Sequence, residues 1–243
     1  MRYLPFQVRK IPHLPNSYIQ ILNNLNKELA LQEIIRDRVT LPKLLTTLIH
    51  GSAVYAGNNY DVFAVENLLS TGKPNSKHTF MEALMIVNLK EAVDYTLNIV
   101  NKDITVEHIS EIHFHLTKGL TDKDMGCPIY TPDDKRDLEE IVNISRTIQD
   151  PFVKAIYLEL NLYRFNKCMA RLVQFHSLFN SNRVPLVSSH YTITGLEDSI
   201  MYYISHLNSS EYTKWFMSSY LEMFRKLIGH NKINLLSEGL DLI

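Results

Sequence analysis

The stretch LNLYRFNKCMARL, residues 160–172, decides how this chain can be interpreted, because its pattern is that of a loop running into a helix. Apolar residues recur at helical spacing from Met169 onward. Asn166, Lys167 and Arg171 lie around the start of that helix, where backbone N–H groups favour negative charge. The stretch therefore predicts a helix whose first turn is suited to an anion.

The rest of the chain predicts an all-α fold. Glycine is scarce, with 8 residues, and strand-like alternation is almost absent. Three prolines keep the arm Met1–Pro15 out of a helix, and a single short β-hairpin is expected within Asp122–Asp134. The expected helices are Ser17–Arg38, Leu41–Tyr55, Val62–Ser70, Phe80–Asn101, Val106–Lys118, Leu138–Gln149, Pro151–Tyr163, Met169–Asn180, Gly195–Leu207 and Ser210–Ile228.

Composition and charge exclude several classes of protein. The formal net charge is −1 and no polybasic run occurs, so we expect neither nucleic acid nor a membrane as a partner. No apolar run approaches the roughly 20 residues that span a bilayer, and the first residues lack the apolar segment of a signal peptide. We expect a cytoplasmic protein with free thiols, and signal-less secretion into a host stays open.

Two segments of the chain together resemble the Fic family, whose enzymes transfer AMP or related groups from a nucleotide to a protein hydroxyl. The family's motif is H-P-F-x-x-G-N-G-R-x-x-R, and an ungapped alignment from its end places it on residues 160–171. A second alignment, with Asn166-Lys167-Cys168 on H-P-F, stays open. The resemblance implies a Fic-like helical bundle with a short β-hairpin flap over residues 48–243, preceded by an N-terminal arm and helical extension over residues 1–47.

The substitutions in this motif remove the chemistry that the resemblance implies. Transfer of AMP needs a histidine base, glycines that let the backbone cradle phosphate, and an acidic metal ligand. Here the base position is Leu160 or Asn166, and neither accepts a proton at neutral pH. Phe165 and Lys167 replace the glycines, and no carboxylate lies between Leu160 and Arg171. We expect no catalytic residue and no metal ligand. A remnant of a nucleotide or phosphate pocket is left at Asn166, Lys167 and Arg171.

The second segment, Ser52-Ala-Val-Tyr-Ala-Gly-Asn58, is similar to the family's inhibitory-helix motif, S-x-x-x-E followed by G or N. Ala56 stands where the glutamate belongs. Ser52, Ala56 and Gly57 are therefore an inhibitory-motif remnant, and the loss of the glutamate suits a chain that no longer needs self-inhibition.

The expected hairpin supplies a function that survives these losses. Its flap residues are Cys127, Pro128, Ile129, Tyr130 and Thr131. In Fic proteins the equivalent flap pairs with an extended segment of the target by strand addition, through backbone groups. Because backbone pairing does not use the lost catalytic side chains, a chain that kept its flap can still bind a polypeptide.

We therefore expect a pseudoenzyme that acts by binding a protein, such as another Fic protein or a host target. A homo-oligomer is a further option, because large apolar residues gather between Met201 and Phe224. One alternative is an active Fic-type nucleotidyl- or phosphotransferase (adenylyltransferase-like) with a non-standard motif. ATP and Mg²⁺ are expected as cofactors only in that case. The other alternative is an unrelated all-helical interaction protein.

Two further candidates have simpler explanations. His108, Glu111 and His115 share a helical face, but the spacing is too wide for a catalytic zinc motif and a further ligand is missing. Cys168 lies beside Lys167 at a helix start, which can lower a thiol pKa. However, the nearest candidate to orient it, His176, lies two turns further along the same helix, so we do not expect a catalytic cysteine.

Overall fold

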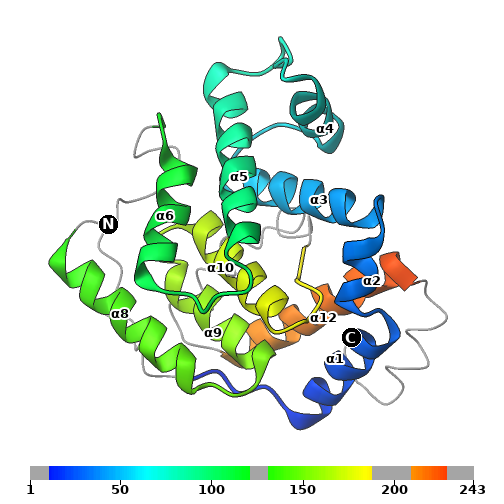
Figure 1. The fold of residues 1–243 in the computed structure, drawn as a ribbon, viewed down its shortest axis with the longest axis vertical. Helices are drawn as coiled ribbons and strands as arrows, with labels where there is room; N and C mark the ends of the chain where they lie inside the picture. The colour runs from blue at the N-terminus through cyan, green and yellow to red at the C-terminus, as the bar shows by residue number, and fades with distance from the viewer. Residues whose placement is uncertain (1–10, 121–130, 188–208, 229–243) are drawn as a thin grey trace.

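The computed structural model describes residues 11–120, 131–187 and 209–228, and within these ranges the chain forms helices and no strand (Figure 1). The all-α fold expected from the sequence is confirmed. None of the helices in these ranges is long and apolar enough to cross a membrane. In chain order they are α1 (Asn16–Glu28), α2 (Leu31–Arg36), α3 (Thr40–Tyr55), α4 (Val62–Thr71), α5 (Phe80–Asn98), α6 (Val106–Thr117), α8 (Pro132–Thr147), α9 (Pro151–Leu162), α10 (Lys167–Asn180) and α12 (Ser209–Ile228).

Helix α10 is the centre of the fold and packs against α9, α6, α3 and α5 (Figure 1). Every side chain from Cys168 to Leu178 is buried. A helix that is enclosed on all sides is normally apolar all round, yet this one carries Arg171, Gln174 and His176. These polar groups are therefore held inside the core rather than on a solvated face.

Helices α5 and α6 are neighbours joined by a short turn (Figure 1). Thr79 starts α5 with a capping box, in which its hydroxyl accepts from the Glu82 N–H and the Glu82 carboxylate accepts from the Thr79 N–H. The Asn88 side-chain amide of α5 donates to the carbonyl oxygens of Leu116 and Lys118, at 3.2 and 2.8 Å. This buried bridge fixes the C-terminal end of α6 against α5.

The single helix expected over Ser17–Arg38 is wrong, because the structure contains two helices there. α1 ends at Glu28, and Leu29 takes an extended conformation with φ −133° and ψ 95°. The chain then turns, and α2 buries Leu31 and Ile34. No glycine or proline marks the break, so tertiary packing of the two leucine-rich pieces overrides the local helical preference.

Asn26 anchors α1 to the C-terminal part of the chain. Its side-chain amide donates to the Tyr220 hydroxyl at 3.0 Å, and its side-chain oxygen accepts from the Val184 N–H at 2.7 Å. The Tyr220 hydroxyl donates to the Val184 carbonyl oxygen at 2.5 Å. Helix α1 thus packs into the common core, and a division of the chain at residues 47 and 48 stays a prediction.

Helix α12 fills the core with aromatic rings. Tyr220 stacks between Phe216 and Phe224, with ring centroids 5.7 and 5.1 Å away, and meets the edge of Phe152 from α9 at 5.8 Å. All four rings are buried. Core packing therefore accounts for this part of the aromatic set near the C-terminus.

Helix α8 begins at Pro132, well before the expected start at Leu138, so that boundary is wrong. Thr131 caps the helix by accepting from the Asp134 N–H at 3.1 Å, and proline loses no hydrogen bond in a first turn. The other described helices match their expected ranges within three residues. The helix expected over Gly195–Leu207 lies outside the described residues.

Candidate functional site

The fold brings the two motif-like segments together, although Ser52 and Cys168 are 116 residues apart in the chain. Helix α3 packs against α10, and the Cys168 thiol donates a hydrogen bond to the Ser52 carbonyl oxygen at 3.3 Å. Both residues are buried. The end of α3 and the beginning of α10 therefore form one candidate site.

The end of α3 is a Schellman motif built on Gly57. The Gly57 N–H donates to the Val54 carbonyl oxygen at 2.9 Å. The next N–H, from Asn58, donates to the Ala53 carbonyl oxygen, also at 2.9 Å. Gly57 has φ +89°, a conformation that is strained for a residue with a Cβ atom. Ala56 is the half-buried C-cap, so the glycine of this segment has a structural reason independent of any inhibitory role.

Helices α9 and α10 are joined by a tight turn of residues 163–166. The Asn166 N–H donates to the Leu162 carbonyl oxygen at 3.3 Å. Asn166 then caps α10, its side-chain oxygen accepting from the Met169 N–H at 2.9 Å. Leu160 lies inside α9. The motif-like stretch is thus mostly helix, and it has no glycine that would let the backbone approach a phosphate closely.

Lys167, the first residue of α10, lies over two aromatic rings. Its Nζ atom is 5.2 Å from the centroid of the Tyr55 ring and 6.0 Å from that of Tyr163. These rings meet edge to face, with centroids 5.8 Å apart. A cation at this distance from a ring face is attracted to it. Lys167, which is half-buried, is therefore held at the contact between α3 and α10.

Arg171 lies one turn further along α10 and has no exposed surface. Burial raises the pKa of the Cys168 thiol to about 12, although the nearby charges of Arg171 and Lys167 act to lower it. The effect of burial on the thiol pKa is larger than that of the two charges. The thiol therefore stays protonated at neutral pH and is not an activated nucleophile. Asn166 is also buried, and Lys167 is the member of the trio that reaches solvent. The structure places all three at one end of α10, and anion binding there stays a prediction.

The sequence interpretation missed a buried carboxylate, Glu159, just before the motif-like stretch. Its side chain is buried and accepts a hydrogen bond from the Gln174 side chain of α10. Asn161 nearby donates to the Tyr157 carbonyl oxygen at 2.8 Å. A polar seam therefore runs between α9 and α10. The signal was available in residues 155–162, which are apolar on every face of the helix except at Glu159 and Asn161.

One histidine of α6, His115, lies near two carboxylates. The two ring nitrogens of His115 lie 3.6 Å from Glu91 and 3.7 Å from Glu111. When protonated, His108 acts to lower the pKa of His176 in α10. Within the part of the chain that the structure describes, no group of three or more potential ligands could hold a metal ion.

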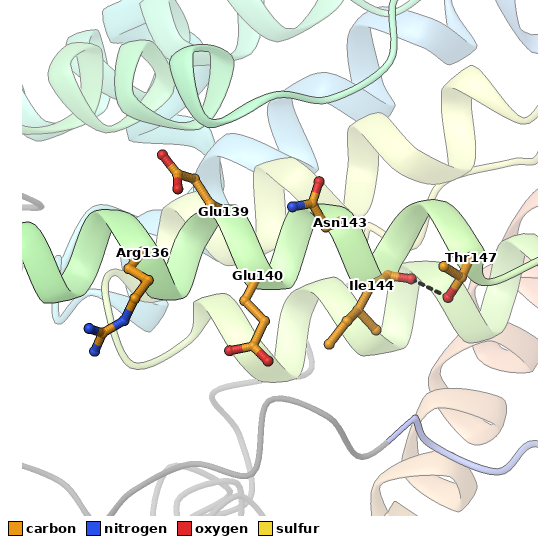
Figure 2. Close-up of a pocket in the computed structure, with 6 residues that line it drawn as sticks. All are labelled: Arg136, Glu139, Glu140, Asn143, Ile144 and Thr147. Carbon is orange, nitrogen blue, oxygen red and sulfur yellow. Dashed lines mark hydrogen bonds between the residues drawn. The ribbon is translucent and has the colours of Figure 1, made fainter.

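A hollow of about 520 Å³ lies along the surface of α8 (Figure 2). All its lining side chains come from this one helix, and Figure 2 shows them spread along it rather than converging on a point. None of them belongs to the α3 and α10 site, so the hollow does not extend that site. The lining residues are Arg136, Glu139, Glu140, Asn143, Ile144 and Thr147.

The flap residues are only partly placed. Cys127, Pro128, Ile129 and Tyr130 lie outside the described residues, so the expected hairpin stays a prediction. Thr131 is described and serves as the N-cap of α8.

Comparison with solved structures identifies the fold class of this helical arrangement. The chain aligns with Fic-1 (residues 134–508) from C. elegans with a TM-score of 0.70 and 15% identity, covering 89% of this chain and 72% of that one. A single-substitution variant of the same Fic-1 segment gives a TM-score of 0.69 at 14% identity, with the same coverage. No family model matches the chain, and no curated protein matches it. At this identity the likeness shows the fold alone: the chain has a Fic-like all-α fold.

Proposed function

We propose that this chain is a catalytically degenerate Fic-like protein that acts by binding another protein. The observation that supports it is the packing at the start of α10, where Asn166, one candidate base position, is buried as the helix cap and Arg171 has no exposed surface. A transferase needs a base and phosphate-binding donors that its substrate can touch. Helix packing occupies both groups here.

The base that transfer needs is missing as well. Leu160 is apolar and lies within α9. The side-chain oxygen of Asn166, the alternative base position, is engaged with the Met169 N–H. Loss of a general base typically slows a reaction by about 10²–10⁴. Either alignment of the motif therefore supports a non-catalytic role.

Binding of a polypeptide needs none of these groups. Strand addition uses backbone N–H and C=O groups, and residues 127–131 directly precede the capped start of α8. We propose residues 127–131 as the pairing segment and a polypeptide as the partner, either another Fic protein or a host target.

The catalytic half of the proposal is tested by label transfer. The purified chain is incubated with labelled ATP, CDP-choline, UTP or GTP and Mg²⁺, with an active Fic protein as the positive control. We expect no labelled protein above background. The triple variant L160H, F165G and K167G restores the motif's base and glycines and shows whether the scaffold can support transfer. Transfer of label from a nucleotide to any protein by the unmodified chain would contradict the proposal.

Residual phosphate binding is a second candidate, favoured by one observation: Asn166, Lys167 and Arg171 lie together at the beginning of α10, and Lys167 reaches solvent. Calorimetric titration with each nucleotide and Mg²⁺ tests it. Saturable binding that is lost in Lys167→Ala but kept in Lys135→Ala, an exposed lysine on α8, would support this site. If none of the four nucleotides gave a binding heat, residual phosphate binding would be excluded and protein binding would remain as the proposed function. Arg171→Ala is informative only if its helical signal matches that of the unmodified chain, because Arg171 is buried.

The binding half is tested with purified candidate partners, an active Fic protein and candidate host proteins, by biolayer interferometry. The informative pair of variants is Ile129→Pro, which removes one backbone donor, and Ile129→Ala, which keeps it. Strand addition predicts that the proline variant binds at least about tenfold more weakly, whereas the alanine variant stays near the unmodified chain. Equal binding by both variants would exclude this mode of recognition.

A further inference from the structure

His176 of α10 joins the central helix to the turn between α5 and α6. Its side chain is 2% exposed, and its Nε2 atom lies 3.1 Å from the Ile99 carbonyl oxygen. Its Nδ1 atom is buried without a hydrogen-bond partner among the described residues. One turn further, the Asn180 amide donates to the carbonyl oxygens of Val100 and Lys102, at 2.7 and 3.3 Å. Two side chains of α10 thus hold the turn, and His176 is the ionisable one of the two.

The surroundings of His176 disfavour a positive charge. Burial has the largest effect and lowers the pKa of His176 from its ordinary value of about 6.5. Two facing cations, His108 of α6 when protonated and Lys154 of α9, act in the same direction. The Ile99 carbonyl and the Asp103 carboxylate of the turn favour the charge. The residues one turn away on α10 itself are not ionisable.

We propose that His176 is an acid-sensitive clasp that holds the 99–103 turn on α10. In its neutral form the imidazole donates from Nε2 to the Ile99 carbonyl oxygen and fits its buried site. In its protonated form it carries a buried charge that faces Lys154 and His108, and the Ile99 carbonyl and Asp103 offset only part of the cost of burying it. Separation of the turn from α10 gives the imidazolium access to water, so acid opens the clasp. This inference does not depend on the proposed function.

The direction of the pH effect follows from the lowered pKa. The unfolded or opened state binds a proton more readily than the closed state, so the contribution of His176 is complete above about pH 6.5 and is lost as the pH falls below it. Helix α6 follows this turn. Opening of the clasp therefore frees the beginning of α6, whereas the Asn88 bridge keeps its C-terminal end against α5.

Hydrogen exchange of the full chain between pH 5.0 and 7.5 tests the clasp. The reporters are the amides of Ile99, Val100 and Lys102, which make backbone hydrogen bonds in this turn. After correction for intrinsic exchange, the opening constant should rise below pH 6.5 by up to about tenfold per pH unit. In His176→Gln, which can donate to Ile99 without titrating, this rise should disappear. Persistence of the full rise in this variant would overturn the proposal.

Two charge variants provide an independent arm if His176→Gln does not fold. Lys154→Met removes a facing cation and should reduce the acid effect, whereas Asp103→Asn removes a facing carboxylate and should increase it. Asn180→Ala is the matched control, because it should loosen the turn equally at every pH. If the acid-dependent rise of the opening constant changed in the same direction in both charge variants, the proposal would also be overturned.

Discussion

Lys167 at the beginning of α10 lies over the ring of Tyr55 at the end of α3, with 5.2 Å between Nζ and the ring centroid. The next residue of α10, Cys168, donates its thiol hydrogen to the Ser52 carbonyl oxygen of α3. These two contacts join the helices at the place where the family resemblance implies a glutamate, and where this chain has Ala56. The helices remain joined without an acidic residue, through a cation over rings and a buried thiol.

Replacement of Lys167 by methionine should lower the free energy of unfolding by about 0.5–1 kcal/mol. The residue is half-buried, and cation–π attraction at such sites has this size. Thermal unfolding should show a loss of about 1–4 °C in Tm. Lys167→Arg keeps a cation over the rings and should remain close to the unmodified protein. An equal loss in both variants would assign the effect to packing rather than to the charge.

Cys168 should be unreactive in the folded protein, because its thiol is buried and burial raises its pKa to about 12. In a Cys127→Ser background, Ellman's reagent at pH 7 should label Cys168 no faster than the protein unfolds. Complete labelling within the mixing time under native conditions would contradict the structure.

The same thiol predicts a loss of stability in alkali. Its folded-state pKa lies above its ordinary value of 9.0, so its contribution is complete below pH 9 and is lost as the pH rises further. Urea unfolding at pH 7 to 10.5 should therefore show a steeper alkaline loss in the Cys127→Ser parent than in its Cys168→Ala derivative. The alanine variant has its own constant loss from the missing side chain, so the comparison is between slopes. Parallel slopes would show that the thiol does not ionise on unfolding.

Local chemistry made most helix boundaries predictable. Thr105 before α6 and Pro151 at the first position of α9 are signals that act within one turn, and both helices begin where these residues indicate. The break after Glu28 has no such signal, since packing of α2 decides it. Likewise, the order of the elements and two motif-like segments were enough to predict a Fic-like fold, which the structural comparison supports.

The interior of the candidate site was less predictable. The burial of Arg171 depends on α3, α5, α6 and α9 enclosing α10 together, which a helical pattern in one segment does not reveal. The contact between Lys167 and Tyr55 is equally non-local. Sequence therefore identified which residues to inspect, and tertiary packing decided which of them reach solvent.

Replacement of Gly57 by alanine should destabilise the protein by about 1–2 kcal/mol, because φ +89° is unfavourable for a residue with a Cβ atom. No atom lies within 4 Å of an added Cβ, so the loss should report backbone strain rather than a clash. Gly57→Asn should lose less stability than Gly57→Ala, since asparagine tolerates the left-handed region better than alanine does. Urea unfolding measures both. A stability of Gly57→Ala equal to that of the unmodified chain would show that the end of α3 relaxes without cost.

Replacement of Asn26 by alanine should cost about 2–4 kcal/mol, because it removes the partner of the buried Val184 N–H and one partner of the Tyr220 hydroxyl. Tyr220→Phe should cost less, about 1–2 kcal/mol, because the Val184 N–H keeps its acceptor while the hydroxyl bond to the Val184 carbonyl is lost. Asn24→Ala, on the exposed side of the same helix, is the matched control and should stay within about 0.5 kcal/mol. Urea unfolding followed by circular dichroism measures all three. A loss of less than about 0.5 kcal/mol for Asn26→Ala would mean that α1 docks through its leucines alone and that the polar bridge adds no stability.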